Sequence, residues 1–221
     1  MIKVSVVAPS SNNLDDASVQ AAIAHLKEMG FYPVVRDDFI NTKIPYHSND
    51  DEYRAKHLYE ELCSMDSDIL WCLRGGYGAA RLIPILEKLP KPPKPKTLIG
   101  YSDITALHIF LNQKWKMKCI HGAGVSNGIS KEHSHKNFED ICNLLTNRKL
   151  KVKISDIKQM NNIFSELIGK IVGGNLNIVT FSIGTNWQIK TNGKILFLED
   201  VEEKGYQIDR MLEHLKQCGI F

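Results

Sequence analysis

Short apolar runs of strand character alternate with stretches of helical periodicity in the first 120 residues, and this alternation most constrains the fold. Strands are expected at residues 4–8, 31–35, 69–73, 97–100 and 117–120, and helices at 15–29, 55–65 and around 82–86. Several strand runs are apolar throughout, which is typical of parallel strands covered on both faces. The sequence therefore predicts an α/β fold with a mainly parallel sheet flanked by helices.

The pattern changes after about residue 122, where a polar, glycine-bearing loop at 122–134 is expected before a helix through Phe138 and Leu145. The elements predicted beyond it are strands at 150–154, 168–172 and 194–198, a turn at 173–175, and helices at 176–183 and 206–218. We therefore predict an N-terminal α/β domain over residues 1–148. A partial C-terminal α/β domain is expected over 149–221.

Composition excludes several classes of protein. The formal net charge is only +3, from 28 basic and 25 acidic side chains, so neither a nucleic-acid partner nor a membrane surface is required. The five cysteines are scattered and form no C-x-x-C pair, which favours reduced thiols. With no leader-like N-terminus and no membrane-length apolar run, we expect a cytoplasmic protein. The basic, proline-rich stretch at 88–96 predicts an extended, solvated connector.

Ser102 lies between the expected strand at 97–100 and an amphipathic helix. A serine at a strand-to-helix turn projects from the backbone beside peptide N–H groups that can stabilise an oxyanion, which is the geometry of a nucleophile. The segment lacks the Gly-x-Ser-x-Gly pattern, because Asp103 and Ile104 follow the serine. A Ser-Asp pair ahead of an apolar run is also an ordinary helix cap, and the tetrapeptide alone leaves both interpretations open.

Two further segments are candidates for a site at the carboxyl edge of the sheet. Residues 74–78 place Gly75, Gly76 and Gly78 between a strand and a helix, where backbone N–H groups can approach an anion, although a purely structural tight turn explains them equally well. Glu199 directly follows the strand expected at 194–198, where polar side chains reach the ligand-binding edge of a parallel sheet, and the alternative there is a solvated strand end.

The histidines give no metal motif, since none lies in H-E-x-x-H and His133 and His135 have no companion ligand at suitable spacing. We predict no metal and no other cofactor. His108 falls on the helix after Ser102, on a face that points away from the serine. His121 follows a strand and remains a candidate for a base or a binding residue at the sheet edge.

Several separated motifs resemble the LD-carboxypeptidase family, which also includes the microcin-immunity serine peptidases. The segments that carry the resemblance are 7–11, 74–82, 100–108, 121–122, 173–176, 197–201 and 206–212. They occur in order over nearly the whole chain, and the serine segment and residues 208–212 are the most specific.

The resemblance implies a Ser-Glu-His triad that removes the terminal D-alanine from cytoplasmic muropeptides through an acyl-enzyme. By position in the motifs, Ser102 would be the nucleophile and Glu199 the carboxylate that orients the base. The backbone N–H of Asp103 and one from the Gly75-Gly76 turn would bind the oxyanion. The partner would be a muropeptide or another small peptide, and the resemblance suggests a homodimer.

One departure from the family pattern bears on activity. In relatives the triad histidine lies well beyond the helix that contains residues 208–212, and this sequence ends at Phe221. We therefore expect a shortened member without its usual base. The alternatives are a catalytically silent muropeptide-binding module, a microcin-immunity-type peptidase acting on a peptide-nucleotide, and an enzyme in which His121 takes over the base role.

Overall fold

A computed structural model describes residues 1–11, 14–41, 44–129, 133–146, 160 and 167–221. The first unit is a five-stranded parallel sheet in the order β2-β1-β3-β4-β5. Its strands are β1 (Ile2–Val7), β2 (Phe31–Val34), β3 (Ile69–Cys72), β4 (Thr97–Gly100) and β5 (Lys118–His121). The predicted α/β class with a mainly parallel sheet is confirmed.

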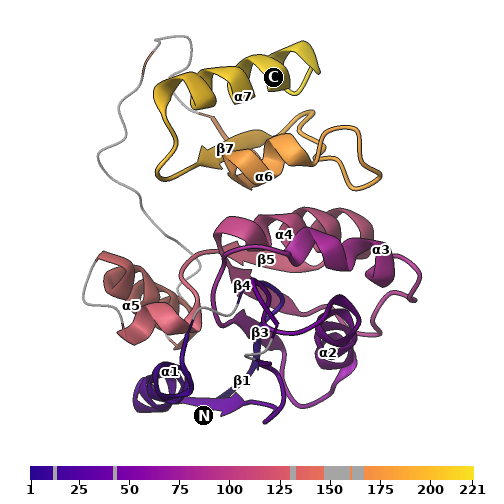
Figure 1. The fold of residues 1–221 in the computed structure, drawn as a ribbon. Coiled ribbons are helices and arrows are strands. Elements are labelled where there is room, and N and C mark those ends of the chain that lie inside the picture. Colours follow the sequence, from indigo (N-terminus) through magenta and orange to yellow (C-terminus); the bar gives the residue numbers. More distant parts are fainter. Residues whose placement is uncertain (12–13, 42–43, 130–132, 147–159, 161–166) are drawn as a thin grey trace.

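Helices cover both faces of this sheet (Figure 1). They are α1 (Asp16–Glu28), α2 (Asp51–Cys63), η1 (Ala79–Leu82), α3 (Ile83–Leu86), η2 (Ser102–Ile104), α4 (Thr105–Phe110), η3 (Leu111–Trp115), η4 (Val125–Ile129) and α5 (His133–Thr146). Asp15 and Asp50 cap α1 and α2 by accepting hydrogen bonds from backbone N–H groups three residues on. The expected helix at 55–65 ends earlier, at Cys63, and Met65 is exposed instead of buried.

Alternate strand residues supply two separate cores because successive side chains of a strand point to opposite faces. Leu70 and Cys72 of β3 belong to the cluster beneath α2, α3 and α4. Trp71 and Leu73 belong to the cluster beneath α1 and α5, where Trp71 stacks on Phe138. The sheet is therefore buried on both sides, as the continuous apolar runs predict.

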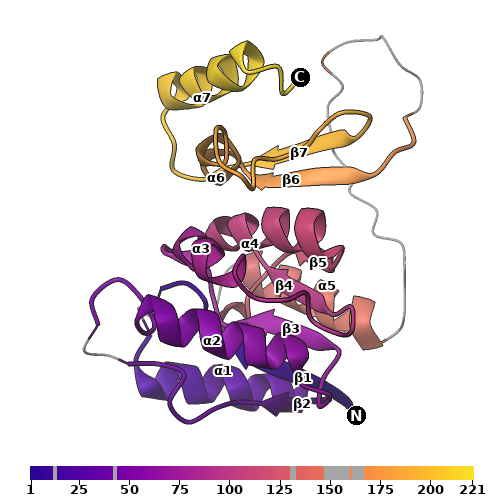
Figure 2. The ribbon, with the colours of Figure 1, turned by 90° about the vertical axis from the view of Figure 1, so that its right-hand side faces the viewer.

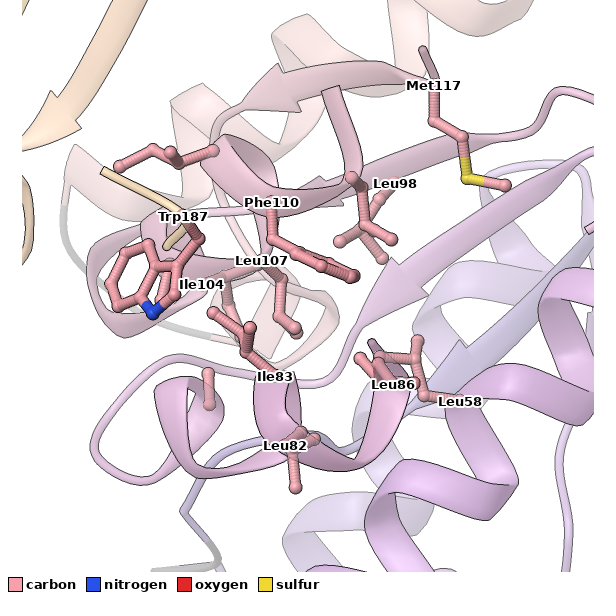
Figure 3. Close-up of a cluster of buried hydrophobic side chains, with 14 of the residues drawn as sticks. Leu58, Leu82, Ile83, Leu86, Leu98, Ile104, Leu107, Phe110, Met117 and Trp187 are labelled. Atoms are coloured by element: carbon pink, nitrogen blue, oxygen red, sulfur yellow. The ribbon is translucent and has the colours of Figure 1, made fainter. Parts of the chain in front are cut away.

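The second unit is a two-stranded parallel sheet with helices, stacked over α3 and α4 of the first unit (Figure 2). Its elements are β6 (Ile171–Asn175), α6 (Leu176–Phe181), β7 (Ile195–Glu199) and α7 (Gly205–Gln217). Trp187 joins the first unit's core beside Ile104 and Phe110 (Figure 3). The predicted domain boundary at 148/149 and the predicted strand at 150–154 lie outside the described residues.

Three sequence expectations need correction. The predicted turn at 173–175 is part of strand β6, where Gly173 (φ +129°) and Gly174 (φ +136°) adopt backbone that other residues avoid. The predicted loop at 122–134 contains the 3₁₀ turn η4 and the start of α5. The connector at 88–96 is not fully solvated, because Lys96 is buried and its Nζ donates to the Glu61 carbonyl.

Candidate active site

Ser102 occupies a strained turn between β4 and the helical segment that follows. The backbone is extended at Tyr101, and Ser102 then adopts φ +57°, in the left-handed region that residues with a Cβ rarely enter. No side chain caps η2 or α4, and the Ser102 hydroxyl has no hydrogen-bond partner among the described residues. The structure therefore favours the projecting serine over the helix cap.

The glycine loop after β3 packs directly against this serine. A Cβ built on Gly75 would lie 3.0 Å from Ser102 Cβ and 3.5 Å from Ser102 Oγ. A Cβ on Gly76 (φ +122°) would lie 2.5 Å from the Ser11 side chain, and Ser11 Oγ accepts a hydrogen bond from Tyr77 N–H at 2.8 Å. A side chain at Gly76 would clash and strain the backbone, and one at Gly75 would crowd Ser102, because the three loops at this edge of the sheet approach so closely.

The buried Asp103 carboxylate holds these loops together through hydrogen bonds. Asp103 is 3% exposed, and its Oδ2 accepts hydrogen bonds from Ser10 Oγ at 2.5 Å and from Ala79 N–H at 2.8 Å. Burial raises the pKa of Asp103, and the two hydrogen bonds partly offset that effect. One side chain thus ties the chain after β1 and the start of η1 to the Ser102 turn.

Glu199 is held at the end of β7, opposite Asn175 of β6. The neighbouring Asp200 accepts hydrogen bonds from Asn175 Nδ2 and from Asn177 N–H, both at 3.1 Å. These contacts direct Asp200 toward the start of α6. The Glu199 carboxylate instead faces the first unit, where His121 Nε2 lies 3.2 Å from Glu199 Oε1.

Two sets of contacts link the strand end at Glu199 to the serine turn. Thr105, one turn beyond Ser102, accepts a hydrogen bond on its Oγ1 from Asn175 N–H at 3.1 Å, and Asn175 pairs with Glu199. His121 pairs with Gly100 of β4, two residues before Ser102, and contacts Glu199 directly. Within the described residues no hydrogen bond joins Ser102 to Glu199 or to His121, so these two side chains flank the serine turn without touching its hydroxyl.

A pocket opens between the two units beside this site. His108 and His121 of the first unit and Gly173 and Phe197 of the second are among its lining residues, and Ser102 is not. Burial, with a smaller contribution from His121, lowers the pKa of His108 to about 3, so this imidazole is neutral at physiological pH.

The described residues contain no group of three or more histidine, cysteine or acidic side chains arranged to hold a metal ion. They also contain no helix that is both long and apolar enough to cross a lipid bilayer.

Comparison with known proteins identifies the family. Residues 4–122 match the LD-carboxypeptidase N-terminal domain, and residues 168–221 match the LD-carboxypeptidase C-terminal domain. The chain belongs to the LD-carboxypeptidase family. The serine turn and the glycine loop fall in the first of these matches, and Glu199 falls in the second. The resemblance seen in the sequence motifs is therefore confirmed.

Individual LD-carboxypeptidase relatives support this membership. A Rickettsia conorii protein with a provisional carboxypeptidase name is 48% identical over 82% of this chain, and the match spans 59% of that protein's length. The murein tetrapeptide carboxypeptidase of Pseudomonas aeruginosa is 28% identical over 96% of the chain and 71% of its own length. The microcin C7 self-immunity protein MccF of Escherichia coli is 27% identical over 80% of the chain and 59% of its own length.

A solved structure gives the same result. The crystal structure of the muramoyltetrapeptide carboxypeptidase from Oxalobacter formigenes superposes with a TM-score of 0.75 at 26% identity. The superposition covers 99% of this chain and 72% of that one. The LD-carboxypeptidase fold is therefore present in both units of the chain described here.

Sequence reasoning located the main chain of this site but missed several supporting side chains. The sequence indicates a backbone N–H donor or a helix cap at Asp103, but not the buried carboxylate that links Ser10 to Ala79. Thr105 was not singled out either, although it contacts the second unit. For Asp103, an aspartate inside an apolar run is a signal in the sequence. For Thr105 there is no local signal, because its contact joins distant segments of the chain.

Proposed function

We propose that this chain is a serine peptidase that removes the terminal D-alanine from muropeptides in the cytoplasm, as part of peptidoglycan recycling. The observation that carries the proposal is the left-handed Ser102 at a strand-to-helix turn, packed against Gly75. The murein tetrapeptide carboxypeptidase of Pseudomonas aeruginosa and the muramoyltetrapeptide carboxypeptidase of Oxalobacter formigenes support the substrate class.

The reaction would begin with attack of Ser102 Oγ on the carbonyl carbon that joins the diamino acid to D-alanine. The N–H of Asp103 and an N–H of the Gly75-Gly76 turn would stabilise the tetrahedral oxyanion, and such donors contribute about 3 to 4 kcal/mol in comparable sites. The C–N bond then breaks, and D-alanine leaves with the proton taken from the serine. Water hydrolyses the resulting ester, so one water molecule is consumed for each peptide bond cleaved.

Glu199 would orient and stabilise the imidazole that moves this proton. Its place at the carboxyl end of β7 supports that role, because the rim of a parallel sheet is where ligands bind. The resemblance implies a histidine base in a segment that relatives carry beyond α7. The residues of this chain would supply the nucleophile, the carboxylate and the oxyanion donors.

Release of D-alanine from a muropeptide tetrapeptide tests the proposal. Ser102→Ala is expected to abolish whatever D-alanine release the chain shows, because the hydroxyl forms the acyl-enzyme. Ser18→Ala, on the distant helix α1, is the matched control and is expected to retain full activity. Turnover that survives Ser102→Ala would refute the serine mechanism.

Calorimetry with the same tetrapeptide separates the enzyme from a silent binding module. Heat of binding without D-alanine release, at high protein concentration, would support the binding module.

The similarity to MccF favours a second candidate activity, hydrolysis of a peptide-nucleotide. Cleavage of an aminoacyl-nucleotide with no cleavage of the tetrapeptide would support that activity instead.

A further inference from the structure

His121 and Glu199 form a contact that bridges the two units. His121 ends β5 of the first unit, Glu199 ends β7 of the second, and His121 Nε2 lies 3.2 Å from Glu199 Oε1. Both side chains are largely shielded, with 22% and 31% of their surfaces exposed. Glu199 Oε1 is buried and accepts no hydrogen bond among the described residues, so this ion-pair contact with the imidazole is the polar contact recorded for it there.

The His121 ring is itself held on several sides. Phe197 packs edge-on against it at 5.6 Å between ring centroids, and His108 does the same at 6.1 Å. A Cβ built on Gly174 would lie 3.2 Å from His121 Nδ1, so the backbone of β6 closes that side of the ring. The imidazole therefore has little freedom to turn away from Glu199.

This arrangement distinguishes a positioning role from a base role. A triad base shares one ring nitrogen with the carboxylate and presents the other to the nucleophile. Here Nε2 faces Glu199, while Nδ1 is buried beside Gly174 and has no polar partner among the described residues. Neither nitrogen is directed to the Ser102 hydroxyl in the part of the chain that the structure describes.

We infer that His121 is a positioning residue, which fixes the Glu199 carboxylate at the edge of the serine turn and aligns the two units with each other. The inference rests on the proposed function, in which Glu199 orients the base. It replaces the hypothesis that His121 itself accepts the proton from Ser102.

Two substitutions at His121 test the role in catalysis. His121→Ala is expected to lower kcat about 10- to 100-fold with little change in KM, because a carboxylate displaced by an ångström no longer orients the base. His121→Gln keeps an N–H donor near Glu199 and should therefore restore most of the lost kcat. Its amide cannot carry a proton at neutral pH, so such a rescue would not come from proton transfer. His214→Ala, an exposed histidine on α7, is the control.

Glutamine that is as inactive as alanine would indicate a proton-transfer role and overturn the inference. Unchanged kcat in His121→Ala would also overturn it. If Ser102→Ala leaves turnover intact, the proposed function fails separately, and activity no longer reports on the His121–Glu199 pair.

A double-mutant cycle on thermal stability judges the pair without any turnover. Melting temperatures are compared for His121→Ala, Glu199→Gln and the double variant. Because the two groups contact each other, the double variant should lose less than the sum of the single losses. Additive losses would show that the two side chains do not interact and would overturn the inference, even for a chain without measurable activity.

Discussion

The two units of this chain bury their apolar residues in different ways. The five-stranded unit contains two clusters, one on each face of its sheet. The two-stranded unit has no separate cluster among the described residues. All of its buried apolar side chains, including Leu176, Trp187 and Leu215, join the first unit's cluster beneath α4. Ile171 and Phe181 of the second unit remain 69% and 62% exposed.

This difference predicts that the second unit depends on the first for its stability. The candidate active site lies where the units meet, since Ser102 belongs to the first unit and Glu199 to the second. The shared cluster, which Figure 3 shows around Phe110 and Trp187, therefore also sets the distance between the two halves of the site. Folding and alignment of the site are expected to be coupled.

The largest loss of stability that tests this comparison is expected for Leu215→Ala in α7. Leu215 is fully buried in the shared cluster, so its truncation should lower the free energy of unfolding by about 3 kcal/mol. Urea unfolding should remain a single transition, with far-UV circular dichroism and tryptophan fluorescence coinciding. Glu213→Gln, exposed on the same helix, should have almost no effect. Two separate transitions would show that the units fold independently.

A smaller effect is expected at Asp103, inside the first unit. Asp103→Ala leaves Ala79 N–H and Ser10 Oγ without their acceptor and should cost about 2 kcal/mol of unfolding free energy. Asp103→Asn keeps an acceptor oxygen for both donors and should cost much less. Equal losses in the two variants, measured by urea unfolding at pH 7, would contradict the structural role of this carboxylate.

The same aspartate variant predicts a change in pH dependence. Burial raises the pKa of Asp103, so the folded protein holds this proton more tightly than the unfolded chain. The resulting stabilisation is fully present below the unfolded pKa near 4 and is lost as pH rises through the folded pKa. The difference in stability between wild type and Asp103→Asn should therefore vary over that window and level off above it.

A second pH-dependent effect concerns His108 in the pocket between the units. Burial lowers the pKa of His108 to about 3. Below pH 6.5 this histidine is therefore protonated in the unfolded chain but stays neutral in the folded protein. Its contribution to stability is present above pH 6.5 and decreases on acidification, by about 1 kcal/mol for the first pH unit. His121 and Cys119 lie beside it. His108→Leu should flatten this acid limb in urea titrations, and an unchanged limb would contradict the assignment.

Much of this architecture was predictable from local patterns. The parallel sheet follows from apolar runs such as residues 69–73, and the strand–turn–helix around Ser102 follows from the change of periodicity there. In the second unit, local rules gave the wrong secondary structure at two glycines. Gly173 and Gly174 indicate a turn by local rules, but they serve a strand in which a Cβ on Gly173 would lie 1.8 Å from the Phe197 carbonyl oxygen.

The candidate site was predictable as a list of residues but not as a geometry. The sequence predicts Ser102, Gly75 and Glu199 as candidates, and the structure places Gly75 against the serine. The contact between His121 and Glu199 could not be foreseen, because it joins residues of different units through the way those units pack. Local periodicity carries no information about such packing.

The Asp103 carboxylate also has a consequence for biosynthesis. Its hydrogen bond to Ser10 joins residues 93 positions apart, so the bend at Ser102 is secured only after β1, β3 and β4 have come together. A nascent polypeptide leaving the ribosome therefore carries Ser102 before the loops that hold its turn are in place. The left-handed bend at Ser102 is therefore expected to form late in folding, once the parallel sheet is complete.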